Sequence, residues 1–185
     1  MISLWKDCII SYVDLIGIRD LARNHSNPAS SIMCGFHALI AKEIKNMPHH
    51  EHIYFWNDTA ALLAFLSNPC GCIVGVMREI EGFMDRTDEL CRCYGISVKG
   101  KAFPSSTLKS VTEQRCTFLR ISSYAFANCL KIEKELGKHK KRLYVDTRII
   151  RHIANAERGT MKTITMYPNY HRRVVHMYRQ SLWKE

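Results

Sequence analysis

Two aspartates stand at the ends of apolar segments that have the composition of buried strands. Asp14 follows the segment Cys8–Val13, and Asp58 closes the segment that begins at Ile53. A carboxylate in such a place is costly unless something pairs with it. Mg²⁺ prefers oxygen ligands and needs only one or two carboxylates when substrate phosphates supply other oxygens. We therefore expect Asp14 and Asp58 to converge on a divalent metal ion.

The turn after Asp14 has features that suit phosphate binding. Residues 16–19 open a predicted helix, so their main-chain amides would lie at the positive end of the helix dipole. Gly17 allows a close approach of the backbone, and Arg19 either adds positive charge or is solvated. Turns also favour aspartate. The pattern alone therefore leaves Asp14 and Asp58 open to a second explanation, as ordinary cap and turn residues.

Length, composition and charge restrict the class of protein. A chain of 185 residues, 46% of them hydrophobic, can form one domain with a real core. The net charge of +10 favours an anionic partner, which can be nucleotide phosphate, nucleic acid or an acidic membrane face. The N-terminus has no signal-peptide pattern, and no apolar run reaches the ~18 residues of a membrane span. We expect a cytoplasmic protein with reduced cysteines and no membrane contact.

Hydrophobic periodicity predicts an α+β protein with a mixed sheet flanked by helices. Strands are predicted at 8–14, 53–56, 59–66, 94–103, 117–121, 143–145 and 161–167. Helices are predicted after the turn at 15–20, at 31–46, at 70–92, from Ser122 or Ser123 to Leu136, and from Asp146 to Asn155. Residues 60–66 favour a helix equally well, and 104–116 have the composition of a polar loop.

Four segments, in order along the chain, resemble class III nucleotidyl cyclases. Residues 12–18 resemble the first metal motif of that family, and 55–58 resemble the hairpin that carries its second aspartate. Residues 98–100 are similar to its Arg-Gly strand. Residues 123–134 and 141–146 resemble the helix and strand of the small pyrimidine cyclases of bacterial anti-phage signalling, the Pycsar cyclases. The resemblance covers roughly residues 8–150 and identifies 1–170 as a catalytic domain followed by a basic tail or last strand at 171–185.

This resemblance implies a ferredoxin-like class III cyclase fold that forms a head-to-tail homodimer. It implies that UTP or CTP is converted to cUMP or cCMP and pyrophosphate with two Mg²⁺ or Mn²⁺ ions. The product would be a second messenger of anti-phage defence, read by a separate cyclic-nucleotide-sensing effector protein, without a nucleic-acid or membrane partner. The implied metal ligands are Asp14, Leu15 and Asp58; the implied substrate-binding residues are Leu15, Ile16, Gly17, Ile18, Arg19, Tyr54 and Lys99; and the implied catalytic residues are Asp14, Asp58, Asn128 and Lys131.

The sequence departs from the family on the predicted helix and strand that follow the second aspartate. Ser123 replaces the usual Gly, and Lys99 replaces the usual Arg. Where purine cyclases carry Asn and Arg, this chain has Ala127 and Lys131. The transition-state cation is then Lys131, with Asn128 nearby, or another group. Lys131 is equally explained as part of an exposed helix face.

Tyr54 occupies the position at which purine cyclases carry their base-selecting lysine, which argues against adenine. A tyrosine in a strand is equally explained as a packing aromatic. Two other functions therefore stay open: a purine (ATP or GTP) cyclase or degenerate nucleotide-binding homologue, and a basic nucleic-acid-binding module. The second is motivated only by the net charge of +10 and predicts binding that weakens steeply with salt.

Overall fold

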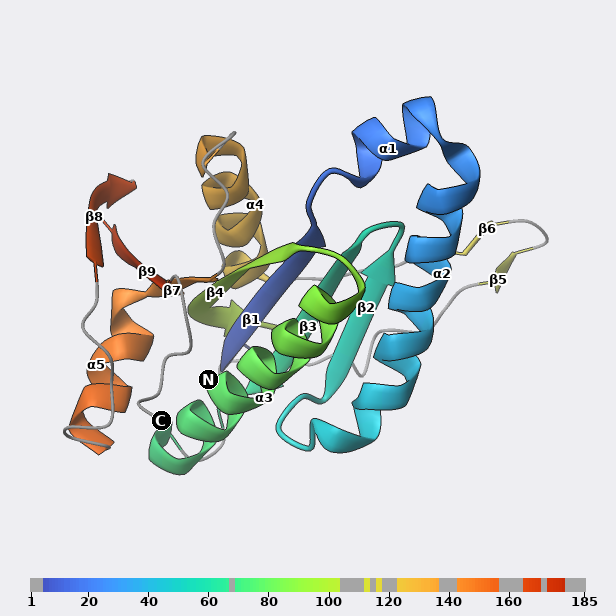
Figure 1. The fold of residues 1–185 in the computed structure, drawn as a ribbon. Helices are drawn as coiled ribbons and strands as arrows, with labels where there is room; N and C mark the ends of the chain where they lie inside the picture. The colour runs from blue at the N-terminus through green and yellow to red at the C-terminus, as the bar shows by residue number, and fades with distance from the viewer. Residues whose placement is uncertain are drawn as a thin grey trace.

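A seven-stranded sheet forms the middle layer of the computed structural model, with helices on both faces (Figure 1). The structure describes residues 5–66, 69–103, 112–113, 116–117, 123–136, 143–156, 165–170 and 173–178. The strands are β1 (Lys6–Leu15), β2 (His52–Trp56), β3 (Thr59–Phe65), β4 (Cys93–Ala102), β5 (Thr112–Glu113), β6 (Cys116–Thr117), β7 (Leu143–Asp146), β8 (Thr165–Tyr170) and β9 (Arg173–Tyr178). The helices are α1 (Ile18–Asn24), α2 (Ser26–Glu43), a 3₁₀ turn (Ile44–Asn46), α3 (Pro69–Leu90), α4 (Tyr124–Leu136) and α5 (Thr147–Ala156).

Strand β1 lies in the middle of the sheet, whose order is β2-β3-β1-β4-β7-β9-β8. It pairs antiparallel with β3 on one side and with β4 on the other. Strand β7 is parallel to β4, which makes the sheet mixed as predicted, and β9 is antiparallel to β7 and β8. Strands β5 and β6 form a separate two-stranded sheet. None of the described helices combines the length and apolarity needed to cross a bilayer.

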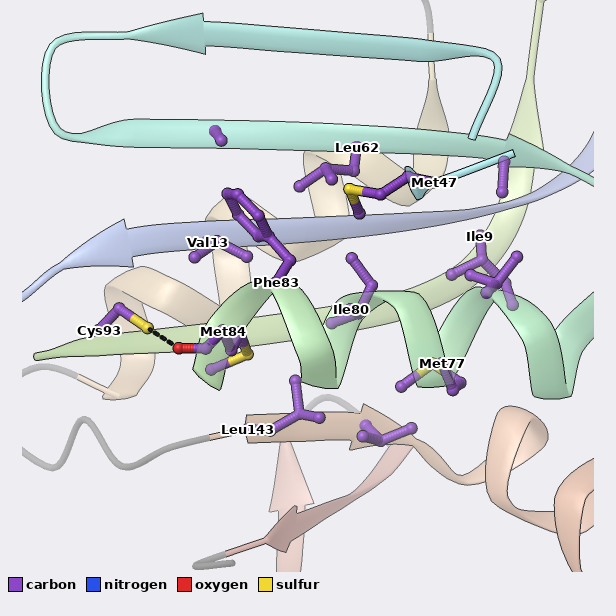
Figure 2. Packing of buried hydrophobic residues seen from close by; sticks show 14 of the residues in the cluster. Ile9, Val13, Met47, Leu62, Met77, Ile80, Phe83, Met84, Cys93 and Leu143 are labelled. Carbon is purple, nitrogen blue, oxygen red and sulfur yellow. Dashed lines mark hydrogen bonds between the residues drawn. The ribbon is translucent and has the colours of Figure 1, made fainter. Parts of the chain in front are cut away.

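Helices α2, α3 and α5 cover one face of the sheet with a continuous apolar layer. Successive strand residues point to opposite faces, so Ile9 and Val13 of β1 both point into this layer. Helix α3 presents Phe83 and its neighbours at helical spacing against them (Figure 2). Phe83 is 1% exposed, and burial of one such side chain contributes about 1.5–3 kcal/mol. We call this side the α3 face.

Helix α4 covers the opposite face, which we call the α4 face. Its contact row consists of Ala125, Cys129, Ile132 and Leu136, which recur at the spacing of one helix side. The helix approaches β4 closely because Gly100 has no side chain. A Cβ atom at Gly100 would lie 2.9 Å from the Cβ atom of Ala125. The glycine therefore sets the depth at which α4 sits on the sheet.

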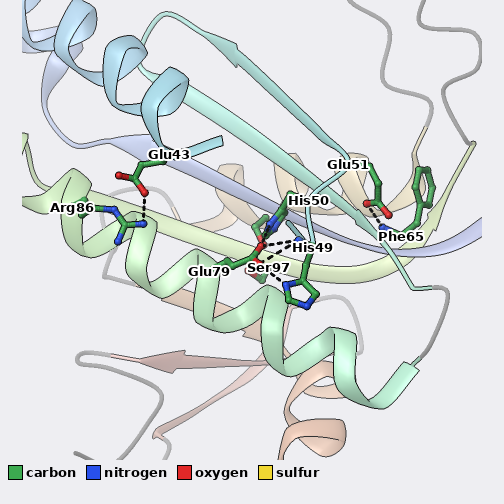
Figure 3. A network of polar contacts seen from close by, with 9 residues as sticks. Glu43, His49, His50, Glu51, Phe65, Glu79, Arg86 and Ser97 are labelled. Carbon is green, nitrogen blue, oxygen red and sulfur yellow. Dashed lines mark hydrogen bonds and ion pairs between the residues drawn. The ribbon is translucent and has the colours of Figure 1, made fainter. Parts of the chain in front are cut away.

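A polar cluster joins the loop before β2 to the middle of α3 (Figure 3). Glu79 accepts hydrogen bonds from the ring nitrogens of His49 and His50, the latter at 2.8 Å. Burial would raise the pKa of Glu79, but the hydrogen bonds and charge of His50 and His49 outweigh it and lower that pKa below 4.5. An ion pair 2.7 Å long between the buried Glu43 and the partly exposed Arg86 joins α2 to the same helix.

Most predicted elements are confirmed, with one clear difference at α2. That helix begins at Ser26 rather than near residue 31, and Pro28 lies in its first turn. A proline is tolerated there because its missing N–H group would have no partner inside the helix. Residues 59–65 form a strand, which excludes the helical alternative.

The predicted caps of α4 and α5 are confirmed by side-chain bonds. Ser123 Oγ accepts hydrogen bonds from the N–H groups of Ala125 and Phe126, and Asp146 Oδ1 accepts one from the N–H group of Arg148. Most of the predicted strand 117–121 lies outside the described residues. Of the predicted strand 161–167, residues 161–164 lie outside the described residues, and the described strand runs from 165 to 170. Residues 173–178 form a last strand inside the sheet.

Candidate functional site

Asp14 lies near the end of β1 and is held from the neighbouring strand. It pairs with Thr59 of β3 on one side and with Tyr94 of β4 on the other. Thr59 Oγ1 donates a hydrogen bond to Asp14 Oδ1 at 2.6 Å. Alternation along β1 places Asp14 on the α4 face, since Tyr12 packs in that cluster. The half-buried carboxylate therefore has a defined direction at the end of the sheet where β1 leads into α1 (Figure 1).

Asp58 belongs to the turn between β2 and β3 and reaches the same end of the sheet. Its main-chain carbonyl accepts a hydrogen bond from the N–H group of Leu15 at 3.0 Å, directly beside Asp14. Asn57 adopts a left-handed conformation with φ 50°, which asparagine tolerates. His37 Nε2 of α2 lies 2.7 Å from the Asn57 carbonyl oxygen and holds the turn. The structure thus places the main chain of Asp58 beside the residue that follows Asp14, and convergence of the two carboxylates on a metal ion stays a prediction.

The turn after Asp14 differs in part from the predicted phosphate cradle. The N–H group of Leu15 is bonded to Asp58, and that of Ile16 donates to the Arg92 carbonyl at 2.7 Å. These two amides are therefore not free donors for phosphate. Gly17 caps α1 in a left-handed conformation with φ 85°, which favours glycine. The Ile18 side chain is buried, whereas Arg19 is exposed.

Tyr54 lies on the α4 face, as a group near Asp14 should. It pairs with Ala61 of β3, which in turn pairs with Tyr12 of β1. Its side chain is only 6% exposed in this chain and packs in the cluster under α4. Beside it, Trp56 contacts the ring of Phe126 of α4, with centroids 6.0 Å apart.

Lys99 does not join this site. It lies on the α3 face, where its Nζ atom is 3.0 Å from Nε2 of His152 on α5. Burial and the Lys99 charge lower the pKa of His152. Lys99 pairs with Ile9, whereas Asp14 pairs with Tyr94, so the two positions are about 16 Å apart along the strand at the usual rise per residue. The prediction that Lys99 faces the base beside Tyr54 is corrected, because strand alternation turns it to the other face.

Asn128 and Lys131 lie on α4, outside the row that packs on the sheet. Asn128 is half-buried, and Lys131 is exposed. An exposed lysine fits a solvated helix face, and it also fits a group that acts on a second chain. The hydrogen bond identified at the Asp14 carboxylate comes from Thr59, and neither Asn128 nor Lys131 takes part in it. The catalytic role of these two residues therefore stays a prediction.

The sequence analysis missed the polar residues that surround Asp14. Thr59 and the buried tyrosines Tyr12 and Tyr94 come from three strands, and Glu133 comes from α4. Tyr94 donates a hydrogen bond to Glu133 Oε1 at 3.1 Å. Burial, and then the nearby Asp14 charge, raise the pKa of both tyrosines, so they stay protonated. Thr59, Tyr94 and Glu133 are far from Asp14 in sequence, so only strand register and the packing of α4 reveal them.

The donor set fits Mg²⁺ or Mn²⁺ that shares its coordination with a substrate. Asp14 and Asp58 supply two carboxylates on adjacent turns, and the main chain of Leu15 supplies a carbonyl beside them. The part of the chain that the structure describes contains no group of three or more His, Cys, Asp or Glu side chains suited to a metal. Two carboxylates completed by phosphate oxygens are the arrangement that Mg²⁺ commonly uses. A bound nucleotide would therefore complete the coordination of a metal ion held by these residues.

Comparison with known proteins identifies the fold. A bacterial light-regulated adenylyl cyclase matches with TM-score 0.65 and 9% identity over 94% of this chain and 90% of that one. The adenylyl cyclase CyaB from P. aeruginosa matches with TM-score 0.60 and 8% identity over 98% of each chain. The non-canonical dimeric guanylyl cyclase domain of the RhoGC fusion protein from the aquatic fungus Blastocladiella emersonii matches with TM-score 0.51 and 6% identity over 93% of each. No family model and no curated protein sequence matches the chain. The predicted class III cyclase fold is confirmed: this chain folds as nucleotide cyclases do.

Proposed function

We propose that this chain is a nucleotidyl cyclase that converts a nucleoside triphosphate to its 3′,5′-cyclic monophosphate and pyrophosphate. The observation that carries the proposal is the meeting of Asp14 and Asp58 at one end of a sheet with the fold of adenylyl and guanylyl cyclases. Asp14 lies near the end of β1, and Asp58 lies in the turn that precedes β3. A cation shared with a triphosphate gives both of them a purpose.

Asp14, Asp58 and the Leu15 carbonyl would hold two Mg²⁺ or Mn²⁺ ions, which when bound lower the pKa of the attacking hydroxyl and neutralise the leaving group. Thr59 keeps the Asp14 carboxylate in one direction through its hydrogen bond of 2.6 Å. The turn Gly17–Arg19 would contact the phosphates. Precise placement of such groups matters because phosphoryl transfer depends almost entirely on positioning and charge.

A homodimer is part of the proposal because helix α4 carries large side chains that are exposed to solvent in a single chain. Tyr124 is 65% exposed although its ring packs 4.9 Å from Trp5, and Leu130 is 39% exposed. Lys131 is exposed on the same helix. In a head-to-tail pair, Asn128 and Lys131 of one chain would reach the triphosphate held by Asp14 and Asp58 of the other. The similar guanylyl cyclase domain described as dimeric supports the formation of a dimer.

The base remains the open part of the substrate. Tyr54 stands where purine cyclases have a lysine, and it is buried on the α4 face, which favours UTP or CTP. The similar structures are adenylyl and guanylyl cyclases, which favours ATP or GTP. A cyclic nucleotide of either kind would act through a separate effector protein that binds it, and the resemblance of residues 123–146 to anti-phage cyclases supports a role in defence.

The test is to incubate the purified chain with Mn²⁺ and each of the four ribonucleoside triphosphates, and to separate the products by chromatography. We expect one cyclic monophosphate with an equal amount of pyrophosphate. Asp14→Asn should abolish the product, whereas the matched control Asp20→Asn, an exposed acid of α1, should not change it. Absence of any cyclic product, with wild type and Asp14→Asn indistinguishable, contradicts the proposal.

A further inference from the structure

Tyr94 is a fully buried tyrosine whose hydroxyl lies between two acids. It pairs with Asp14 across β1 and β4 and is 0% exposed. The hydroxyl donates a hydrogen bond to Glu133 Oε1 of α4 at 3.1 Å, and the strand register places the same side chain beside Asp14 on the α4 face. One phenol side chain therefore lies beside the candidate metal ligand and is bonded to the helix that covers the same face.

Packing alone does not explain why this buried position carries a hydroxyl group. A phenylalanine would fill the same buried space, and a buried hydroxyl costs about 1–3 kcal/mol if it lacks a partner. Both of its acidic neighbours, Asp14 and Glu133, accept hydrogen bonds only. The hydroxyl is therefore explained by the carboxylates that it joins.

Asp14 and helix α4 are each held in place by contacts with the sheet. Asp14 accepts a hydrogen bond from Thr59 of β3 and lies beside its pairing partner Tyr94 of β4, so residues of both neighbouring strands flank it. Helix α4 is held near its start by the close contact of Ala125 with Gly100, and near its end by the bond from Glu133 to Tyr94. The last turns of α4 are thus tied to the same tyrosine as the acid.

We propose that Tyr94 is a positioning residue of this site, which fixes the Asp14 carboxylate for the metal ion and ties helix α4 to it through Glu133. This inference rests on the proposed cyclase function. Because α4 also carries Asn128 and Lys131, the tie couples the metal site to the helix that presents these two polar groups. Tyr94 would act through Asp14 and Glu133 without touching the reacting atoms.

The direct test is Mn²⁺ binding without turnover, measured by the loss of the electron paramagnetic resonance signal of free Mn²⁺ during titration with the metal alone. Tyr94→Phe removes only the hydroxyl and should weaken Mn²⁺ binding about 10- to 100-fold, the usual range for groups that orient a metal ligand. The matched control is Tyr144→Phe, a buried tyrosine of β7 on the same face, which should bind Mn²⁺ as the wild type does.

A second measurement separates positioning from stability. In turnover assays, Tyr94→Phe should raise the Mn²⁺ concentration that gives half-maximal rate, whereas Glu133→Ala should mainly lower the rate at saturating Mn²⁺. The effects of the double variant should be smaller than the product of the single effects, because both changes break the same link. Glu133→Ala lies at the edge of the core, so it also serves if Tyr94→Phe fails to fold.

Three results decide the matter. Weaker Mn²⁺ binding by Tyr94→Phe, with Tyr144→Phe unchanged, supports the inference. Equal Mn²⁺ binding by Tyr94→Phe and the wild type overturns it and leaves the cyclase proposal intact. A wild-type chain that binds no Mn²⁺ at all overturns the metal site itself, and the positioning role of Tyr94 with it.

Discussion

On the α3 face of the sheet, three helices bury a mainly apolar layer, whereas on the α4 face the described chain places one helix over tyrosines, hydroxyls and acids as well as apolar side chains. The first layer includes Phe83 and Val13, each at most 1% exposed. The second includes Asp14, which accepts a hydrogen bond from Thr59, and Tyr94, which donates one to Glu133. The same strands supply both faces by simple alternation. One face can therefore provide the stability that lets the other hold polar groups in fixed positions.

The largest expected effect is on the α3 face. Phe83→Ala removes a buried ring and leaves a cavity, which should lower the free energy of unfolding by about 3–5 kcal/mol. Urea denaturation followed by circular dichroism measures the change. A loss below about 1 kcal/mol would break the comparison, because the α3 face would then not carry the stability assigned to it.

The next effect concerns activity rather than stability. Asp58→Asn keeps the size of the side chain but removes its charge, so cyclase kcat should fall about 10²- to 10³-fold, the cost of losing a principal electrostatic group. Its unfolding midpoint in urea should stay close to that of the wild type, since Asp58 lies in a half-buried turn. If Asp58→Asn lowered the stability of the fold but kept the specific activity of the wild type, the α4 face would serve stability rather than catalysis, which would contradict the comparison.

A smaller effect is expected at the polar cluster around Glu79. The pKa of Glu79 is lowered in the folded chain, so its charged form stabilises the fold above the unfolded pKa near 4.5, and this contribution is lost as the pH falls through the folded value. Glu79→Gln should therefore cost about 1–3 kcal/mol at neutral pH. The difference from wild type should shrink below about pH 4.5. Urea unfolding at a series of pH values checks this, and a difference that grows in acid contradicts it.

The smallest effect is expected at the start of α4. Ser123→Ala removes the cap that accepts hydrogen bonds from the N–H groups of Ala125 and Phe126 and should cost about 1 kcal/mol. Ser123→Asn, which keeps a capping oxygen, is the matched control. Thermal unfolding of the two variants compares them, and equal losses would show that the cap does not hold α4.

Hydrophobic periodicity in the sequence was sufficient to predict the elements that form from a local pattern of residues. The strand that leads to Asp14, the hairpin at Asp58 and the cap at Ser123 are all where the sequence predicts them. The start of α2 was misplaced because Pro28, usually a breaker, is harmless in a first helical turn. The residue at which a helix starts depends on which main-chain N–H groups need hydrogen-bond partners rather than on composition.

The site was predictable only in part because it depends on register between distant strands. Asp14 and Asp58 stand out as acids in apolar segments, so a sequence can reveal them. Tyr94 and Glu133 resemble ordinary strand and helix residues until pairing places Tyr94 opposite Asp14. The correction at Lys99 has the same origin, since its face follows from alternation along β4.

The central claim is that Asp14 and Asp58 share bound cations beside a triphosphate. Crystals of the chain soaked with Mn²⁺ and a nucleoside triphosphate that lacks its 3′-hydroxyl test it most directly, through the anomalous signal of manganese. We predict manganese peaks bonded to both carboxylates and to phosphate oxygens. Carboxylates that point apart with no manganese between them, while the nucleotide is bound elsewhere, would contradict the account.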